Sequence, residues 1–290
     1  FEPHGGAAAM TALWDSVWSA CPFGFCQFGF MQRALVAAAL VGLAAPAIGI
    51  FLVQRRLSLM GDGIGHVAFT GVAAGFLFNV LPLVTAIIAA VVGAVVIELL
   101  REKGRTQGDV ALAVVFYGGI AGGALLMALA GTSNANALGY LFGQLLNVQS
   151  SDLWAALIIA GGVLGLTTLL RRVLFAVSYD EEVARVAGVR LRAVNLLIAI
   201  AAAITIGVTM RVVGILLVSG MLVLPVAAVQ QLTRSFHATF VGSLALGLVV
   251  SVGGLVVSYY VNAPPGATIV VGAIGAFILA TVFARARTVM

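Results

Sequence analysis

Long apolar runs separated by short polar connections fill most of the chain. The first clear run covers residues 31–53 and is closed by Arg55 and Arg56. At a rise of 1.5 Å per residue, about 20 residues cross a hydrocarbon core roughly 30 Å thick. The pattern therefore predicts an all-α, polytopic integral membrane protein with eight or nine transmembrane helices. The further predicted spans are residues 57–78, 83–100, 110–130, 153–170, 193–210, 212–228, 238–260 and 267–283.

Two places depart from this regular pattern. Residues 137–148 are apolar but only about half as long as a span, which indicates a short or re-entrant helix. Only Arg211 separates the runs 193–210 and 212–228. We therefore expect the chain to turn at Arg211, which then lies at or near the outer end of both helices, or deeper if one of them is broken.

The basic residues sort to one side of the predicted membrane. All of the 15 lysines and arginines except Arg33 and Arg211 fall in four loops or in the C-terminal tail. If the chain crosses the membrane at each predicted span, all of these loops and the tail lie on the same side. An excess of lysine and arginine marks that side as the cytoplasm. The C-terminus is then inside and the N-terminus outside. The loops and tail are residues 54–56, 101–105, 171–192, 234 and 285–287.

Composition supports the membrane assignment. The chain is 62% hydrophobic and only 9% charged, whereas soluble domains carry about 25% charged residues. The net charge of +5 does not indicate nucleic-acid binding, because the basic residues bracket apolar runs. Residues 31–287 are expected to form a single transmembrane domain. Residues 1–30 precede it as a processing remnant followed by an interfacial segment rich in Trp and Phe. Cys21 and Cys26 in that segment are either a small disulfide loop or two buried thiols.

The candidate site is an acid and a histidine four residues apart within the segment 54–75. Asp62 and His66 share one face of a helix at this spacing. If the helix begins just past Arg56, the two side chains lie roughly 9 Å and 15 Å deep. Ionisable groups at such depth are costly and indicate function, and an oxygen with a nitrogen suits zinc or manganese. The alternatives are an N-cap role for Asp62 and a neutral, hydrogen-bonded His66 inside the bundle.

Five sequence blocks in order resemble the metal-ion branch of the ABC importer permeases, over roughly residues 30–284. The blocks are FMQRAL at 30–35, RRLSLMGDGIGHVAFTGVAAG at 55–75, YLFGQLL at 140–146, VVGILLVSGMLVLPVAA at 212–228 and PPGATIVV at 264–271. The chain departs from the family pattern at Gln144 and Asn262, where acidic residues are frequent, and at Val226 and Val229, where small residues are usual.

The resemblance implies a type II ABC importer-like permease that works as a homodimer in the inner membrane of a prokaryote. It implies a transported ion, zinc before manganese or iron, with Asp62 and His66 as metal ligands and no permanently bound cofactor. An extracytoplasmic metal-binding protein would deliver the ion. The chain has no Gly-x-x-x-x-Gly-Lys-Ser/Thr phosphate loop, so it is not expected to be an enzyme, and a separate ABC subunit would hydrolyse ATP.

The polar stretch 178–192 is the expected coupling segment to that ATPase. It reads as a short cytoplasmic helix with acidic residues in its first turn and arginines in its last, which suits the helix dipole. The alternative is a merely solvated loop. The resemblance places the family's coupling helix here, with the first-turn acids on the docking face. The coupling residues are then Tyr179, Asp180, Glu181, Glu182, Val183, Ala187 and Gly188.

Three other classes of protein fit the sequence less well. An intramembrane aspartyl protease has a Tyr-Asp pair on one helix and a Gly-x-Gly-Asp motif on a later helix. This chain has Leu59 in place of the first glycine of that motif, and its Tyr179-Asp180 pair follows Asp62 instead of preceding it. A chelate or cobalamin permease would not need an acid and a histidine in the membrane. A secondary metal transporter would be supported by two-halves repeat symmetry, which the sequence does not show.

Overall fold

Long helices packed side by side make up the described part of the chain. The computed structural model describes residues 24–102, 108–131, 139–143 and 148–289, and these contain helices and no strand. Within these residues seven helices are long and apolar enough to cross a membrane, and two further helices, the shorter α11 and the glycine-rich α3, lie in the same bundle. The predicted all-α fold with eight or nine spans is confirmed. The long helices are α2 (Gly29–Gln54), α3 (Met60–Phe78), α4 (Pro82–Glu102), α5 (Gly108–Leu129), α7 (Ser150–Leu169), α10 (Leu191–Val213), α11 (Ile215–Gln230), α12 (Phe236–Val261) and α13 (Pro265–Val289).

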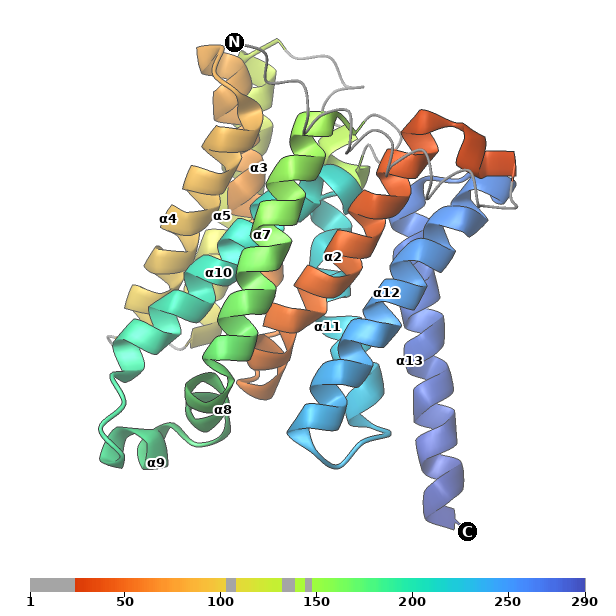
Figure 1. The fold of residues 1–290 in the computed structure, drawn as a ribbon. Coiled ribbons are helices and arrows are strands. Elements are labelled where there is room, and N and C mark those ends of the chain that lie inside the picture. Colours follow the sequence, from red (N-terminus) through yellow and green to blue (C-terminus); the bar gives the residue numbers. More distant parts are fainter. Residues whose placement is uncertain (1–23, 103–107, 132–138, 144–147, 290) are drawn as a thin grey trace, which may run out of the picture.

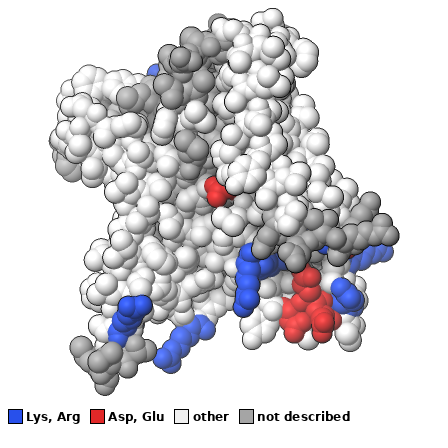
Figure 2. All heavy atoms as spheres, turned by 180° about the vertical axis from the view of Figure 1, so that it is seen from behind, with Lys and Arg blue, Asp and Glu red and all other residues white. Residues whose placement is uncertain are grey.

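Charge is unevenly distributed along the bundle axis. The described residues also include three short helices, η1 (Gly24–Gln27), α8 (Arg171–Tyr179) and α9 (Glu181–Val186). Figure 1 shows α8 and α9 at the same end of the bundle as the C-terminus, whereas α2 starts at the opposite end. On the face seen in Figure 2, most basic and acidic side chains gather at one end of the molecule, and the rest of this face is almost free of charge. This is the distribution expected of a protein whose middle lies in lipid.

Helix α3 is enclosed by α4, α5, α10 and α11. Its approach to α5 is close because α5 has glycine at the contact: a Cβ on Gly119 would lie 2.7 Å from backbone atoms of His66 and Val67. Thr70 Oγ1 also donates a hydrogen bond of 2.7 Å to the carbonyl oxygen of Gly119. On the α11 side, Gly61 and Gly65 provide two small positions four residues apart. Small residues at this spacing allow membrane helices to pack backbone to backbone.

The turn between α10 and α11 lies at Gly214, three residues beyond the predicted turn at Arg211. Gly214 has φ +94°, a conformation that favours glycine. A Cβ at this position would also collide with the backbone of residues 141–143. Both constraints select glycine, so the turn forms there. The side chain of Arg211 is outside the described part.

Other predicted features are described only in part. Within 137–148, residues 139–142 are helical, and residues 137–138 and 144–147, including Gln144, lie outside the described ranges. Cys21 and the side chain of Cys26 are likewise not described. Asn262 ends α12 in the left-handed conformation, with φ 54°. Asparagine tolerates this conformation better than most residues, which gives Asn262 a local structural role.

We expect Gly119→Ala to destabilise the protein and Gly118→Ala to leave it unharmed. The added methyl at 119 forces α3 and α5 apart, and overpacking of this kind costs about 1–3 kcal/mol. At Gly118 an added Cβ meets nothing within 4 Å. Thermal unfolding of the two purified variants in detergent measures the difference. Equal unfolding temperatures would contradict the close α3–α5 contact.

The two ends of the bundle are expected on opposite sides of the membrane. Val186 on α9 is 91% exposed and Asn262 after α12 is also exposed, so a cysteine at either position is accessible. In a background with Cys21 and Cys26 replaced by serine, an impermeant maleimide should label N262C on intact spheroplasts, and V186C only after permeabilisation. Labelling of both from the same side would overturn the topology.

Candidate metal site and coupling segment

The acid–histidine pair lies at the beginning of α3. The helix starts at Met60 with Leu59 as its N-cap, so Asp62 is in the first turn and His66 in the second. The start is three residues later than expected, which places the pair about 5 Å nearer to the helix end than the sequence suggested. Asp62 is not the N-cap, because Leu59 occupies that position without a side-chain cap. The capping alternative is therefore wrong.

Asp62 is held by a residue that sequence reasoning did not single out. Ser219 Oγ, on α11, donates a hydrogen bond to Asp62 Oδ1. Ser219 is 9% exposed and is the only hydroxyl residue in α11. A lone hydroxyl in an apolar helix needs a polar partner, which is the signal that could have identified it. The bond fixes one carboxylate oxygen, and no described residue forms a hydrogen bond with the other.

His66 faces α5. Its ring meets Phe116 edge-on, with ring centroids 4.6 Å apart and an interplanar angle of 80°. The side chain is partly exposed, and no hydrogen bond joins its ring nitrogens to a described residue. The alternative of a hydrogen-bonded structural histidine therefore finds no partner in the described part. Both ring nitrogens remain available as donors or ligands.

Chemically, the pair offers one carboxylate oxygen and one imidazole nitrogen from adjacent turns of one helix face. Such a mixed donor set suits borderline divalent ions more than Mg²⁺ or Ca²⁺, which prefer oxygen alone. Within the described residues, no third His, Cys, Asp or Glu joins the pair to make a group of three. Two donors alone do not complete a tetrahedral metal site, so an ion bound here would need further ligands.

The predicted coupling segment 178–192 contains a helix shorter than expected, α9, and Arg190 and Arg192 lie beyond it at the start of α10. Asp180 is the N-cap of α9: its Oδ1 accepts hydrogen bonds from the backbone N–H groups of Glu182 (2.9 Å) and Val183 (3.0 Å). Glu181 and Glu182 lie in the first turn and Arg185 in the last. Gly188, with φ +82°, ends the segment before α10. Residues 181–186 are therefore a capped helix and not a loop.

An apolar surface on α8 and α9 faces away from the bundle. Tyr179 is 81%, Val183 65% and Val186 91% exposed. Ala187 beside them is also exposed, whereas Ala184 is buried against the protein. Exposed apolar side chains at the charged end of the molecule are a candidate protein-binding surface.

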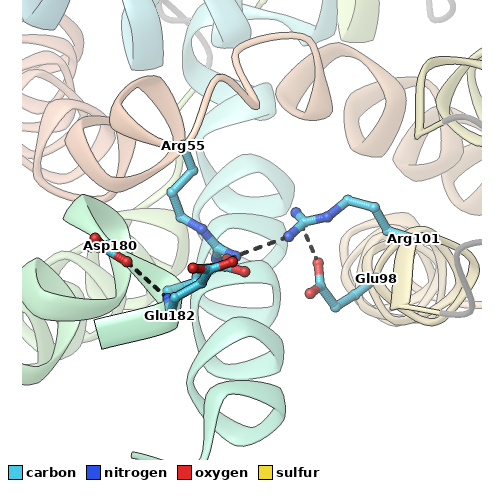
Figure 3. Close-up of polar contacts among 6 residues, drawn as sticks. Arg55, Glu98, Arg101, Asp180 and Glu182 are labelled. Carbon is cyan, nitrogen blue, oxygen red and sulfur yellow. Dashed lines mark hydrogen bonds and ion pairs between the residues drawn. The ribbon is translucent and has the colours of Figure 1, made fainter. Parts of the chain in front are cut away.

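Glu181 points toward the bundle instead of lying on this surface. Its Oε1 pairs with Arg55 Nη2 and lies 3.8 Å from Arg101 Nη2, and Arg101 Nη1 lies 3.3 Å from Glu98 Oε2. Figure 3 shows the Arg55 and Arg101 side chains converging at the start of α9. The two first-turn acids thus differ: Glu182 is exposed and has no ion pair within the described residues, whereas Glu181, whose side chain is 40% exposed, pairs with arginines of the bundle.

The Arg55 side chain is only 4% exposed. Burial lowers the pKa of its guanidinium below the ordinary value, nearby Arg101 adds to this effect, and Glu181 opposes it. A buried arginine needs a carboxylate to offset lost hydration. Glu181 is that carboxylate, so the position of α9 is tied to the connection between α2 and α3.

The helical bundle with a polar pair on an enclosed helix defines a polytopic membrane permease. The sequence matches the profile of the ABC 3 transport family over residues 27–284, and the chain belongs to this family. It is a metal-ion ABC importer permease and a multi-pass protein of the prokaryotic inner membrane.

Relatives named for different metals match the chain over similar lengths. A probable metal transport system membrane protein of Treponema pallidum is 32% identical over 85% of this chain and 93% of the relative. The manganese import system permease protein ScaB of Streptococcus parasanguinis is 30% identical over 79% and 81%. The high-affinity zinc uptake system membrane protein ZnuB of Haemophilus influenzae is 26% identical over 84% and 93%.

The fold is also shared with a solved structure. The structure of PsaBC from Streptococcus pneumoniae in complex with Fab includes a chain that superposes with a TM-score of 0.80 at 28% identity, covering 93% of this chain and 95% of that one. The predicted family and its fold are therefore confirmed.

Proposed function

We propose that this chain is the membrane subunit of an ABC importer that moves zinc or manganese into the cell, and that Asp62 and His66 bind the ion on its way. The observation that carries the proposal is the Asp62–His66 pair itself, on a helix that packs against four others in a member of a metal-importer family. Zinc, the first choice from the sequence, remains a prediction, because relatives named for zinc and for manganese are both present.

The ligand set is completed by a second copy of the chain. One helix supplies two donors, and a transporter must release its ion, so a partial set from each protomer of a homodimer fits better than a closed tetrahedral cage. The Ser219 hydroxyl holds Oδ1 of Asp62 and leaves the second oxygen to meet the ion. An extracytoplasmic metal-binding protein delivers the ion at the end of the bundle opposite α9.

The ATPase subunit docks on the exposed surface formed by Tyr179, Val183, Val186 and Ala187. Glu182 lies beside this surface. Asp180 caps the N-terminus of α9, and Gly188 ends the segment after it. Glu181 connects the docked helix to the permease through Arg55. Because Met60 begins α3 only five residues after Arg55, a displacement of α9 reaches the start of the helix that carries Asp62.

Uptake by Asp62→Asn tests the metal site. Asparagine keeps an oxygen that can accept the Ser219 hydrogen bond, so the variant removes the charge and preserves the packing. We expect uptake of radioactive zinc and manganese into proteoliposomes, with the ATPase and the binding protein present, to fall by about tenfold or more, which corresponds to about 1.4 kcal/mol. Competition between zinc, manganese and iron in the same assay identifies the ion.

Two variants control this measurement. Ser219→Ala removes the hydrogen bond but keeps the carboxylate, so it should retain more uptake than Asp62→Asn. His66→Gln removes the imidazole nitrogen and should lower uptake as Asp62→Asn does. Near-normal uptake by Asp62→Asn at wild-type protein levels would overturn the site.

The coupling role of Glu181 is tested by Glu181→Gln, with Glu182→Gln as its control. The two residues are neighbours of equal charge, but only Glu181 pairs with Arg55 and Arg101. We expect Glu181→Gln to keep the ATPase bound while fewer metal ions move per ATP hydrolysed, because the link to Arg55 is weakened. Glu182→Gln should keep normal coupling. The proposal fails if the two variants behave alike, or if Glu181→Gln loses the ATPase on purification.

A further inference from the structure

A cavity of about 540 Å³ lies between the ends of α7, α8 and α12. It is far from Asp62 in sequence and shares no lining residue with the metal site or with the network around Arg55. α7 ends and α12 begins at its rim, so the cavity sits where two apolar spans reach the charged end of the bundle. Because basic residues gather at this end of the bundle, we assign the cavity to the cytoplasmic interface of the membrane.

One wall of the cavity is aromatic. Phe236 packs against Phe175 with ring centroids 4.7 Å apart and against Phe240 at 6.3 Å. Val241 beside Phe240 lines the cavity and is 52% exposed on the outer side of α12. These side chains form an apolar surface that continues along α12 toward the middle of the membrane. It is the kind of surface that an acyl chain covers.

The mouth of the cavity is cationic. Arg171 and Arg172, at the start of α8, line it together with His237, and no Asp or Glu is among the lining residues. Both arginines are exposed, and neither forms an ion pair within the described part of the chain. Two adjacent guanidinium groups repel a metal ion and attract a phosphate. The cavity is therefore unsuited to the transported cation.

We propose that this cavity binds an anionic phospholipid, with the headgroup phosphate on Arg171 and Arg172 and one acyl chain along Phe236 and Phe240. Basic pockets between helices at the cytoplasmic interface are the places where anionic lipids bind membrane proteins. A water-soluble phosphate would use the arginines but not the aromatic wall. The lipid would join α8 to α12, and α8 leads directly into α9, so its binding would steady the segment on which the ATPase is proposed to dock.

Native mass spectrometry of the purified chain tests this inference. The probes are phosphatidylglycerol and phosphatidylcholine of matched acyl chains, added to detergent-solubilised protein. We expect wild type to retain phosphatidylglycerol over phosphatidylcholine by about tenfold or more. Arg171→Gln/Arg172→Gln should lose this preference. Arg285→Gln/Arg287→Gln, which removes the same charge at the same end of the bundle, should keep it.

A cavity-filling variant separates the site from general surface charge. Thr168 lines the cavity, and Thr168→Trp fills it while both arginines remain. We expect this variant to lose phosphatidylglycerol and to keep the wild-type unfolding temperature. The proposal is overturned if Thr168→Trp and the Arg171/Arg172 variant both bind phosphatidylglycerol like wild type, if phosphatidylcholine is retained equally, or if inorganic phosphate at millimolar concentration displaces the lipid.

Discussion

The close packing of α3 against its neighbours is the constraint on which the rest of the structure depends. A helix that carries a carboxylate and an imidazole cannot face lipid, because unpaired polar groups are costly in hydrocarbon. It must be surrounded by protein, and glycine at Gly119 allows α5 to approach its backbone directly. The hydrogen bond from Thr70 to the Gly119 carbonyl oxygen adds a polar link between the same two helices. Contacts with α4, α5, α10 and α11 thus cover much of α3, while the Asp62 and His66 side chains themselves stay partly exposed.

The turn at Gly214 serves the same helix from the other side. Because α11 begins at Ile215, Ser219 lies one turn into it and reaches Asp62. A side chain at 214 would collide with the backbone of residues 141–143, so the turn also brings the YLFG segment against the bundle. The candidate metal site therefore joins two helices far apart in sequence, α3 and α11, and its geometry depends on a glycine that contributes no donor to it.

The sequence predicted what depends on local pattern and missed what depends on distant partners. Apolar runs and bracketing arginines were sufficient for the helical fold, and the spacing of Asp62 and His66 was sufficient to place both on one helix. Ser219 and Asp62 are 157 residues apart, and Arg55 and Glu181 are 126 residues apart. Helical periodicity relates only residues a few positions apart, so it could not predict either contact. Glu181 and Glu182 look equivalent along the chain, and only the position of Arg55 distinguishes them. The turn was expected at Arg211 because this charged residue interrupts the apolar run. Gly214 was passed over, although glycine readily adopts the φ > 0 conformation found there.

The two partners of the Arg55–Glu181 ion pair differ in burial, so one of them can move more easily than the other. The Arg55 side chain is 4% exposed and the Glu181 side chain 40% exposed. Moving the arginine would leave a desolvated charge without its carboxylate, which is far more costly than moving a half-solvated glutamate. Glu181 lies on a helix of six residues that ends shortly before Gly188, whereas Arg55 is held between two long helices. If an ATPase docks on α9 as proposed, it would therefore move Glu181 more readily than Arg55, which lies five residues before the helix that carries Asp62 and His66.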